Sequence, residues 1–218
     1  MEQGIITTVD VVLFTLQDGR LQVVLVRRER DPYERQLALP GGYIHADEDI
    51  DSQAAARRVL SDKTGLISPY LEQLFTFSGG ARDSRGWSVS IAHYALVSID
   101  VLMSQDNTRF TLLPADDLPQ LPFDHNRIID FAMDRLRNKS TYSALPCHLL
   151  PKVFTLTELQ QTYEKVLGYR LDKSAFRRKI NDLDFLEAID EVRMGVHRPA
   201  RLYRIKSTRN LVLFDRTI

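Results

Sequence analysis

The sequence has very little cysteine: Cys147 is the only one in 218 residues. A single thiol forms no disulfide within its own chain, which argues against a small secreted domain held together by disulfides. A lone cysteine is more often a small buried hydrophobe than a reactive group, and we expect Cys147 to be one. This cysteine usage fits a reducing compartment, and we expect a cytoplasmic protein.

Long apolar runs are also missing from the sequence. No stretch approaches the ~18 apolar residues that a transmembrane helix needs, so no membrane partner is expected. The first residues include Glu2 and no basic segment before the first apolar run, so a signal peptide is not expected either.

Net charge is zero, because 29 lysines and arginines balance 29 aspartates and glutamates. From Leu150 onward, however, the chain has 14 basic and 9 acidic residues, a net charge of +5, which leaves 15 basic and 20 acidic residues before it. A length of 218 residues suits one large domain or two small ones. The charge shift predicts two parts with different tasks.

The sequence at the beginning of the chain predicts a β-hairpin. Ile5 to Leu16 and Leu21 to Val26 are rich in apolar and β-branched residues, and Asp18-Gly19 between them is a strong turn signal. Three arginines follow the second strand: Arg27, Arg28 and Arg30. One interpretation is that they are solvated charges at a strand end. The other is that they bind phosphates or an adenine ring, since a planar guanidinium can donate two parallel hydrogen bonds and can also stack on a ring.

Two adjacent glycines begin the most informative motif. Gly41-Gly42 follows a short apolar run, and paired glycines let the backbone turn and let a ligand approach it closely. The acidic run Asp47-Glu48-Asp49 comes next. Asp51 is then expected to cap a helix that runs to about Lys63, and Gly65 to close it.

This stretch resembles a Nudix box, whose pattern is Gly, five residues, Glu, seven residues, Arg-Glu, an aliphatic residue, any residue, Glu-Glu, any residue, Gly and an aliphatic residue. The matching positions are Gly42, Glu48, Arg58, Leu60, Gly65 and Leu66. The spacer between Glu48 and Arg58 has nine residues rather than seven. So many matches at fixed positions favour a Nudix domain over a helix packed in some other α/β domain.

The departures from the family pattern concern its chemistry. The resemblance implies that Nudix enzymes carry three carboxylates on one helix face, which hold a divalent metal against a pyrophosphate. Here those positions hold Val59, Asp62 and Lys63. Mg²⁺ prefers carboxylate oxygens, whereas an ammonium meets a phosphate directly. We therefore expect a ligand pocket without catalytic residues, without a metal site and without a required cofactor. Mg²⁺ binding stays possible, and other carboxylates, such as Glu48 or Asp49, leave residual hydrolysis open.

A polar loop from Gly79 to Gly86 separates two expected strands, Leu71 to Ser78 and Trp87 to Val97. In a Nudix sheet this loop lies near the Gly-Gly turn. Trp87, the only tryptophan, either stacks on a base there or packs in the core. His93 is expected to be structural.

A helix is expected from Asp124 to Arg137, where apolar residues recur at helical spacing. His125 either edges the pocket or simply begins this helix. The following residues contain Ser, Thr and Pro with little periodicity, so the domain boundary is expected there. We predict an effector-binding domain at 1–140, a linker at 141–151 and a second domain at 152–218.

The second domain predicts a helix-turn-helix. Thr155 and Glu158 fit a capping box for one helix, Gly168 ends it, and Asp172 caps the next helix, Lys173 to Leu183. The outer face of this next helix is polar and mostly basic, with Lys173, Ser174, Arg177, Arg178 and Asn181. Such a helix enters the major groove of DNA.

Two strand-like segments, Leu186 to Val192 and Ala200 to Ile205, flank a turn that contains a glycine. The basic residues of this region are Arg193, His197, Arg198 and Arg201. A basic hairpin after a recognition helix is typical of a winged helix that binds DNA. The alternative is a solvated basic face on a winged helix that docks protein. A last apolar strand, Asn210 to Phe214, has no assigned place.

The whole chain resembles the Nudix-related transcriptional regulators of NAD metabolism, the NrtR family. Two further runs carry this resemblance, Arg82 to Gly86 and Arg198 to Arg204. It implies an α+β fold, in which a Nudix α/β/α sandwich precedes a smaller winged helix-turn-helix domain. It also implies a repressor of NAD biosynthesis or salvage genes, with ADP-ribose or a related nucleotide as effector and a homodimer on palindromic operator DNA.

Candidate site residues follow from these motifs. The candidate ligand-binding residues are Arg27, Arg30, Gly41, Gly42, Arg58, Asp62, Lys63, Asp83, Arg85 and Trp87. The candidate DNA-binding residues are Lys173, Ser174, Arg177, Arg178, Asn181, Arg193, His197, Arg198 and Arg201. Two other functions stay open: an active Nudix pyrophosphatase with an accessory C-terminal domain, and a non-enzymatic adaptor.

Overall fold

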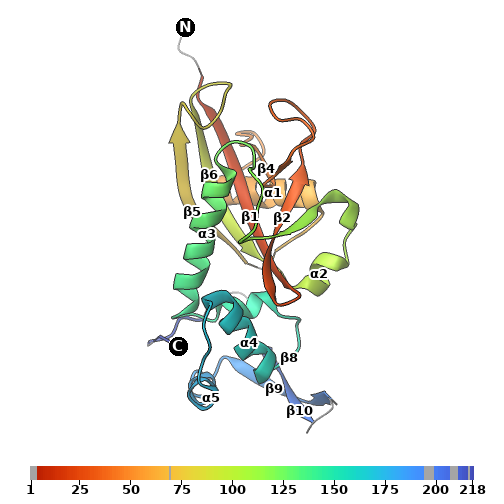
Figure 1. Cartoon of the computed structure of the whole chain (residues 1–218), viewed down its shortest axis with the longest axis vertical. Coiled ribbons are helices and arrows are strands. Elements are labelled where there is room, and N and C mark those ends of the chain that lie inside the picture. Colours follow the sequence, from red (N-terminus) through yellow and green to blue (C-terminus); the bar gives the residue numbers. More distant parts are fainter. Residues whose placement is uncertain (1–3, 69, 194–198, 207–210, 216) are drawn as a thin grey trace.

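The computed structural model describes residues 4–68, 70–193, 199–206, 211–215 and 217–218. In the view of Figure 1, an upper body is built around one large sheet, and a lower body combines helices with a small sheet. The lower body contains the basic last part of the sequence. No helix among the described residues is long and apolar enough to cross a membrane.

Seven described strands form the upper sheet. They are β1 (Ile6–Gln17), β2 (Arg20–Arg27), β3 (Leu37–Ala38), β4 (Gly41–Tyr43), β5 (Tyr70–Gly79), β6 (Ser88–Leu96) and β7 (Thr111–Pro114). The main order is β3-β2-β1-β6-β5, with β4 paired to β1 and β7 paired to β2. The predicted hairpin is confirmed: Asp18 and Gly19 have φ of 50° and 72°, the positive values that a two-residue turn between twisted strands requires.

Helices cover both faces of this sheet. They are α1 (Ser52–Thr64), α2 (Ile99–Met103), the short 3-10 helix η1 (Asn107–Arg109) and α3 (His125–Ser140). Alternate residues of β1 face opposite sides, because side chains alternate along a strand. Val11 packs with Val59 of α1 in one apolar cluster, and Val12 packs with Ile129 of α3 in another. The predicted α/β/α sandwich is confirmed.

Helix α1 begins and ends where the sequence predicts. Asp51 accepts a hydrogen bond from the backbone N–H of Ala54 at 2.7 Å, and Gly65 ends the helix with a φ of 76°. A residue with a Cβ is strained at this φ, so glycine suits the position. These two ends fix the helix beside the Gly-Gly turn, which contains β4.

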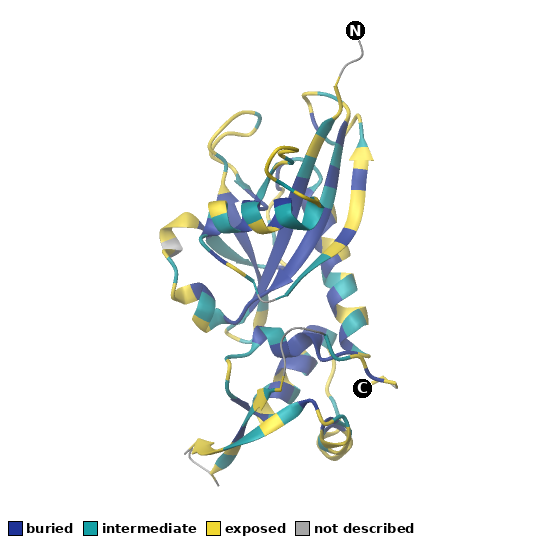
Figure 2. Ribbon diagram, turned by 180° about the vertical axis from the view of Figure 1, so that it is seen from behind, coloured by how far each residue is buried: buried dark blue, intermediate teal, exposed yellow. Residues whose placement is uncertain are grey.

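The lower body has the elements of a winged helix. They are the 3-10 helix η2 (Leu145–Leu149), β8 (Phe154–Thr155), α4 (Leu156–Leu167), α5 (Lys173–Asp182), β9 (Leu186–Arg193) and β10 (Ala200–Ile205). The strands form a small sheet in the order β8-β10-β9. The capping box of Thr155 and Glu158 is present, and Asp172 accepts from Ala175 N–H at 2.7 Å. Only Phe176 and Ile180 of α5 are buried, and Figure 2 shows the rest of that helix largely exposed.

The two bodies meet over residues 141–151, the predicted linker. Leu145 and Leu149 of η2 are buried in the same cluster as Val166 of α4 and the α3 side of the upper sheet. Cys147, also in η2, is buried as expected, and this burial raises the pKa of its thiol. The predicted linker is therefore packed against both bodies rather than loose.

The C-terminal segment now has a place. Val212 accepts from Ala144 N–H at 2.9 Å, and Phe214 N–H donates to Tyr142 O at 2.7 Å, so the described part of the segment pairs with residues just after α3. The ring of Phe214 lies 6.0 Å from that of Phe185 in the winged-helix core. This segment thus joins the end of α3 to the lower body.

Candidate ligand pocket and nucleic-acid interface

A cavity of about 460 Å³ opens beside the Gly-Gly turn of the upper body. The end of β2, helix α1 and the loop before β6 also form its wall. Nine predicted ligand residues line it: Arg27, Arg30, Gly41, Gly42, Arg58, Asp62, Lys63, Asp83 and Arg85. Trp87 does not line it; this residue is half exposed and lies near Gly80.

The two glycines of the turn are required because side chains of β1 and α1 lie too close to leave room for a Cβ. A Cβ at Gly41 would lie 2.1 Å from Oδ1 of Asp10, far inside van der Waals contact. A Cβ at Gly42 would lie 3.0 Å from a methyl carbon of Val59. The sequence predicted small residues here, but the neighbours that require them come from β1 and α1.

The three positions where Nudix enzymes carry carboxylates lie along one side of the cavity. Val59 is buried in the apolar cluster beneath α1, and Asp62 is exposed, 3.8 Å from Arg58. Lys63 forms an ion pair with Glu29, with Nζ and the carboxylate oxygen 3.0 Å apart. Among the described residues, no group of three His, Cys, Asp or Glu side chains is arranged to hold a metal ion. Of these three positions only Asp62 offers a carboxylate, so Mg²⁺ here would depend on this one group together with the phosphates of a ligand.

Arg58 holds the loop between β4 and α1 in place by hydrogen bonds; this loop contains the start of the nine-residue spacer. Its guanidinium donates to both carboxylate oxygens of Asp49, at 2.9 and 2.7 Å, and to the backbone oxygen of Tyr43 at 3.0 Å. The hydrogen bond from Arg58 lowers the pKa of Asp49 to about 2. Arg58 therefore fixes the loop between β4 and α1 as well as lining the cavity.

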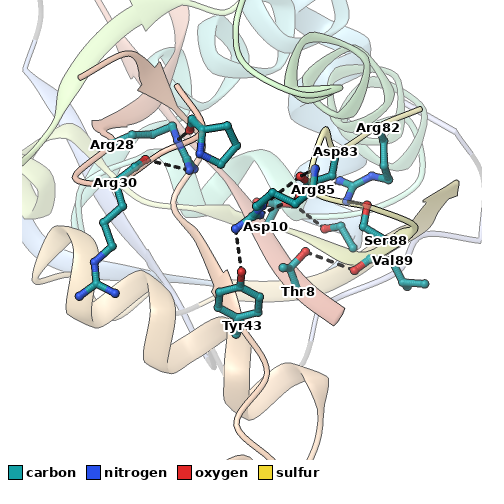
Figure 3. A network of polar contacts seen from close by, with 12 residues as sticks. Thr8, Asp10, Arg28, Arg30, Tyr43, Arg82, Asp83, Arg85, Ser88 and Val89 are labelled. Atoms are coloured by element: carbon teal, nitrogen blue, oxygen red, sulfur yellow. Dashed lines mark hydrogen bonds and ion pairs between the residues drawn. The ribbon is translucent and has the colours of Figure 1, made fainter. Parts of the chain in front are cut away.

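Arginines and aromatic rings form a second wall. Arg85 donates to both carboxylate oxygens of Asp83, at 3.0 and 2.7 Å, and to the hydroxyl of Tyr43 at 2.7 Å (Figure 3). Its guanidinium carbon lies 6.0 Å from the ring centre of Phe123, and that of Arg28 lies 4.9 Å from the same ring. The hydrogen bond to Asp83 raises the pKa of Arg85. The loop of Arg85 thus reaches the Gly-Gly turn, as predicted.

The floor of the cavity is a buried polar group that our candidate residues omitted. Asp10 accepts from Ser90 Oγ at 2.6 Å, and its other oxygen lies 3.6 Å from Nε2 of His125. His125 Nδ1 accepts from Leu39 N–H at 3.1 Å, so the proton of a neutral ring is on Nε2 and faces Asp10. Burial lowers the pKa of His125, which favours that neutral ring. His125 therefore edges the pocket and also begins α3.

The sequence contains one sign of this buried polar group. Asp10 is the only charged residue in β1, within a run whose other members are apolar or uncharged. A charge in a buried strand indicates a partner or a ligand. One cationic partner of Asp10 is Arg82, 3.7 Å away, which comes from a loop distant in sequence. Arg82 also donates to both carboxylate oxygens of Asp124, at 2.9 and 3.2 Å.

Helix α5 presents most of the candidate DNA-binding residues. Those exposed are Lys173, Ser174, Arg178 and Asn181. Arg177 is partly buried, and its Nε is buried without a hydrogen-bond partner in the described structure. The helix begins at the Asp172 cap, and Lys173 and Ser174 in its first turn are exposed.

The predicted wing residues have different surroundings. Arg193 at the end of β9 is paired with Glu158, the capping-box residue of α4. Arg201 is exposed on β10, beside an irregularity in its pairing with β9. His197 and Arg198 lie outside the described residues.

Comparison with known proteins identifies both bodies. Residues 6–130 match the NUDIX domain, and residues 146–205 match the NrtR DNA-binding winged helix domain. The chain belongs to the NrtR family. It is 40% identical over 201 residues to the ADPR responsive transcriptional repressor NtrR of Acinetobacter baylyi, a match that covers 90% of this chain and 80% of that protein.

Solved NrtR structures agree with the whole fold. NrtR of Shewanella oneidensis complexed with a 27mer DNA is 37% identical, with a TM-score of 0.91 over 97% of this chain and 99% of that one. The NUDIX domain of the same protein complexed with ADP ribose is 37% identical, with a TM-score of 0.55 over 62% of this chain and 90% of that one. The family and the fold inferred from the sequence are therefore confirmed.

Proposed function

We propose that this NrtR-family chain is a repressor of NAD biosynthesis or salvage genes in the cytoplasm. ADP-ribose or a related nucleotide binds in the cavity and releases the winged helix from palindromic operator DNA. The observation that carries this proposal is that one chain combines the cavity with an exposed basic helix α5. The effector domain would span 1–140, the linker 141–151 and the DNA-binding domain 152–218.

The cavity suits a nucleotide diphosphate in size and chemistry. Its volume, about 460 Å³, lies within the range of ~300–1,000 Å³ that is common for small-molecule sites. Arg27, Arg30 and Lys63 offer positive charge to phosphates, and the rings of Tyr43 and Phe123 offer flat surfaces to a base. Asp10 in the floor accepts hydrogen bonds, which suits a ribose hydroxyl.

The same site is poorly equipped for hydrolysis. Val59 supplies no oxygen, and Lys63 places an ammonium where a third metal ligand would be needed. In this proposal the ammonium contacts phosphate directly, no metal or other cofactor is required, and no residue is catalytic. The chain then binds the nucleotide without cleaving it.

Helix α3 offers a physical route from ligand to DNA. Its first residue, His125, lies in the cavity wall, and Thr141 just after it accepts a hydrogen bond from Ile218 N–H at 2.7 Å. A ligand that shifts α3 would shift the C-terminal segment and the lower body with it. In a dimer this displaces the two α5 helices from the ~34 Å spacing of successive major grooves.

The decisive experiment is a band shift with duplexes selected from a random pool, titrated with ADP-ribose and with NAD as control. A coupling free energy of ~1–3 kcal/mol predicts operator binding ~5–150-fold weaker with ADP-ribose. The same complex, studied by calorimetry, should show ADP-ribose binding weakened by the same factor. Operator binding that ignores ADP-ribose would reject the proposal.

A further inference from the structure

Asp10 has one carboxylate oxygen to which no described protein group donates a hydrogen bond. Its side chain is only 6% exposed, and Oδ2 accepts from Ser90 Oγ at 2.6 Å. Oδ1 has no donor within hydrogen-bond distance among the residues that the structure describes, because Nε2 of His125 is 3.6 Å away. Burying a charged oxygen without a donor is costly, so this oxygen in a cavity wall indicates a ligand that donates to it.

His125 places a hydrogen-bond donor beside this acceptor. Its Nδ1 accepts from Leu39 N–H at 3.1 Å, so the neutral ring carries its proton on Nε2, the atom that faces Asp10. Both side chains line the cavity. The floor therefore presents an acceptor and a donor 3.6 Å apart, and this pair suits hydroxyl groups, which both donate and accept hydrogen bonds.

The arginines next to the floor are already paired with carboxylates. Arg82 donates to both oxygens of Asp124, and Arg85 donates to both oxygens of Asp83. A phosphate at the floor would also meet the negative charge of Asp10. The floor is therefore unsuited to a phosphate and suited to an uncharged polar group.

Other parts of the wall suit the remaining groups of the proposed effector. Arg27 and Arg30 line the cavity and have no carboxylate partner within the described part of the chain, so their charge is available to a diphosphate. The ring of Tyr43 is 49% exposed and offers a flat surface to adenine. In ADP-ribose the diphosphate joins adenosine to a second ribose, whose free polar groups are hydroxyls. This terminal ribose is the group that matches the floor.

We propose that the floor is a sugar subsite, where the terminal ribose of ADP-ribose donates a hydrogen bond to Oδ1 of Asp10 and accepts one from Nε2 of His125. Ser90 is a positioning residue, because its hydroxyl holds the other oxygen of Asp10 and it does not line the cavity. The inference rests on the proposed function for the identity of the effector alone. Ligand binding by the free chain tests it, with no operator DNA present.

The first test compares ADP-ribose with ADP, which lacks the terminal ribose, by calorimetry on the full chain. Wild type should bind ADP-ribose more tightly than ADP. Asp10→Asn should weaken ADP-ribose binding at least about tenfold, because it removes a charged acceptor. The same variant should bind ADP as tightly as wild type or more tightly, because it removes a negative charge from an anion site. Damage to the fold would weaken both ligands, so only a sugar contact weakens ADP-ribose alone.

The second test changes the positioning residue. Ser90→Ala should weaken ADP-ribose binding about threefold and leave ADP binding unchanged, because the carboxylate loses one neutral hydrogen bond. This variant decides the comparison if Asp10→Asn does not fold, which thermal unfolding of both variants establishes. Asp100→Asn, an exposed site on α2 outside the cavity, is the control for removal of a carboxylate charge and should change neither affinity.

Three results would overturn the sugar subsite. They are an unchanged or higher affinity of Asp10→Asn for ADP-ribose, an equal loss for ADP-ribose and ADP, as expected if Asp10 contacted the adenosine half, and a wild-type chain that binds ADP-ribose no better than ADP. Operator binding that ignores ADP-ribose, in a chain that passes these tests, would count against the proposed function alone. Conversely, an operator response that persists at full strength in Asp10→Asn would count against the subsite alone.

Discussion

The ammonium of Lys63 lies 3.0 Å from a carboxylate oxygen of Glu29, and both residues line the cavity. The hydrogen bond from Lys63 is the first cause of a lowered pKa for Glu29. A carboxylate thus contacts the ammonium that we propose as a phosphate ligand. In our proposal the phosphate therefore competes with Glu29 for Lys63.

Removing the charge of Glu29 should tighten effector binding. Glu29→Gln is expected to lower the dissociation constant of ADP-ribose up to about fivefold, since an exposed ion pair is worth at most ~1 kcal/mol. Lys63→Glu should weaken binding, because it opposes the phosphates with a like charge. Calorimetry in the presence of a chelator measures both. Tighter metal-free binding by Lys63→Glu would contradict the proposed ammonium–phosphate contact.

The wild-type chain should hydrolyse ADP-ribose slowly or not at all when Mg²⁺ is present. The reason is that Asp62 is the only carboxylate at the three family positions and lies beside Arg58. Release of AMP, followed by chromatography with an active Nudix enzyme as control, measures this. Turnover near the ~10 s⁻¹ of ordinary enzymes would instead favour the pyrophosphatase function.

Lys173→Ala should weaken operator binding and reduce its salt dependence by about one unit of slope, as expected for the loss of one phosphate contact. Its affinity for ADP-ribose should not change, because α5 lies outside the cavity. Arg57→Ala on α1 serves as the charge-matched control. Arg177→Ala should weaken operator binding as well, but it needs a thermal-unfolding check because Nε of Arg177 is buried. Unchanged operator affinity in both α5 variants would refute the assignment of this helix.

Acid should destabilise the chain through His148 in η2. Burial lowers its pKa to about 4, compared with 6.5 for an exposed histidine, and its ring lies 5.1 Å from that of Tyr70. Between these two values the unfolded chain binds more protons than the folded one, so the free energy of unfolding falls as pH drops. His148→Phe keeps the aromatic contact and should flatten this dependence by up to ~1.4 kcal/mol per pH unit. Urea unfolding at several pH values between 4 and 7 measures it; an unchanged slope in the variant would assign the effect to other groups.

Local signals in the sequence located most helices and strands. Helix caps depend on contacts between residues a few positions apart, so the sequence alone predicts them. Examples are Asp51, Gly65 and the Thr155–Glu158 capping box. The short elements β3, β4 and β8, of two or three residues, carry too little pattern to be recognised. Helix α2, with five residues, was missed for the same reason.

The site was harder to predict where its contacts join distant segments. The Gly-Gly turn was found, but its contact with Asp10 depends on the pairing of β4 with β1. The Lys63–Glu29 pair joins residues 34 positions apart, and the Arg85–Tyr43 hydrogen bond joins residues 42 apart. Residue type left stacking on a ligand and packing in the core open for Trp87, and its place just before β6 leaves it outside the cavity lining.

The packing of Val59 limits how this chain could evolve. Its side chain belongs to an apolar cluster, and a methyl carbon lies close to Gly42. A glutamate introduced there would disturb this packing, and its carboxylate would lie one helical turn before Lys63, whose ammonium would pair with it in place of a metal ion. Lys63 would have to change as well to restore three carboxylates. A single substitution therefore disturbs the core without completing a metal site, and two changes are needed before three carboxylates line this side of the cavity.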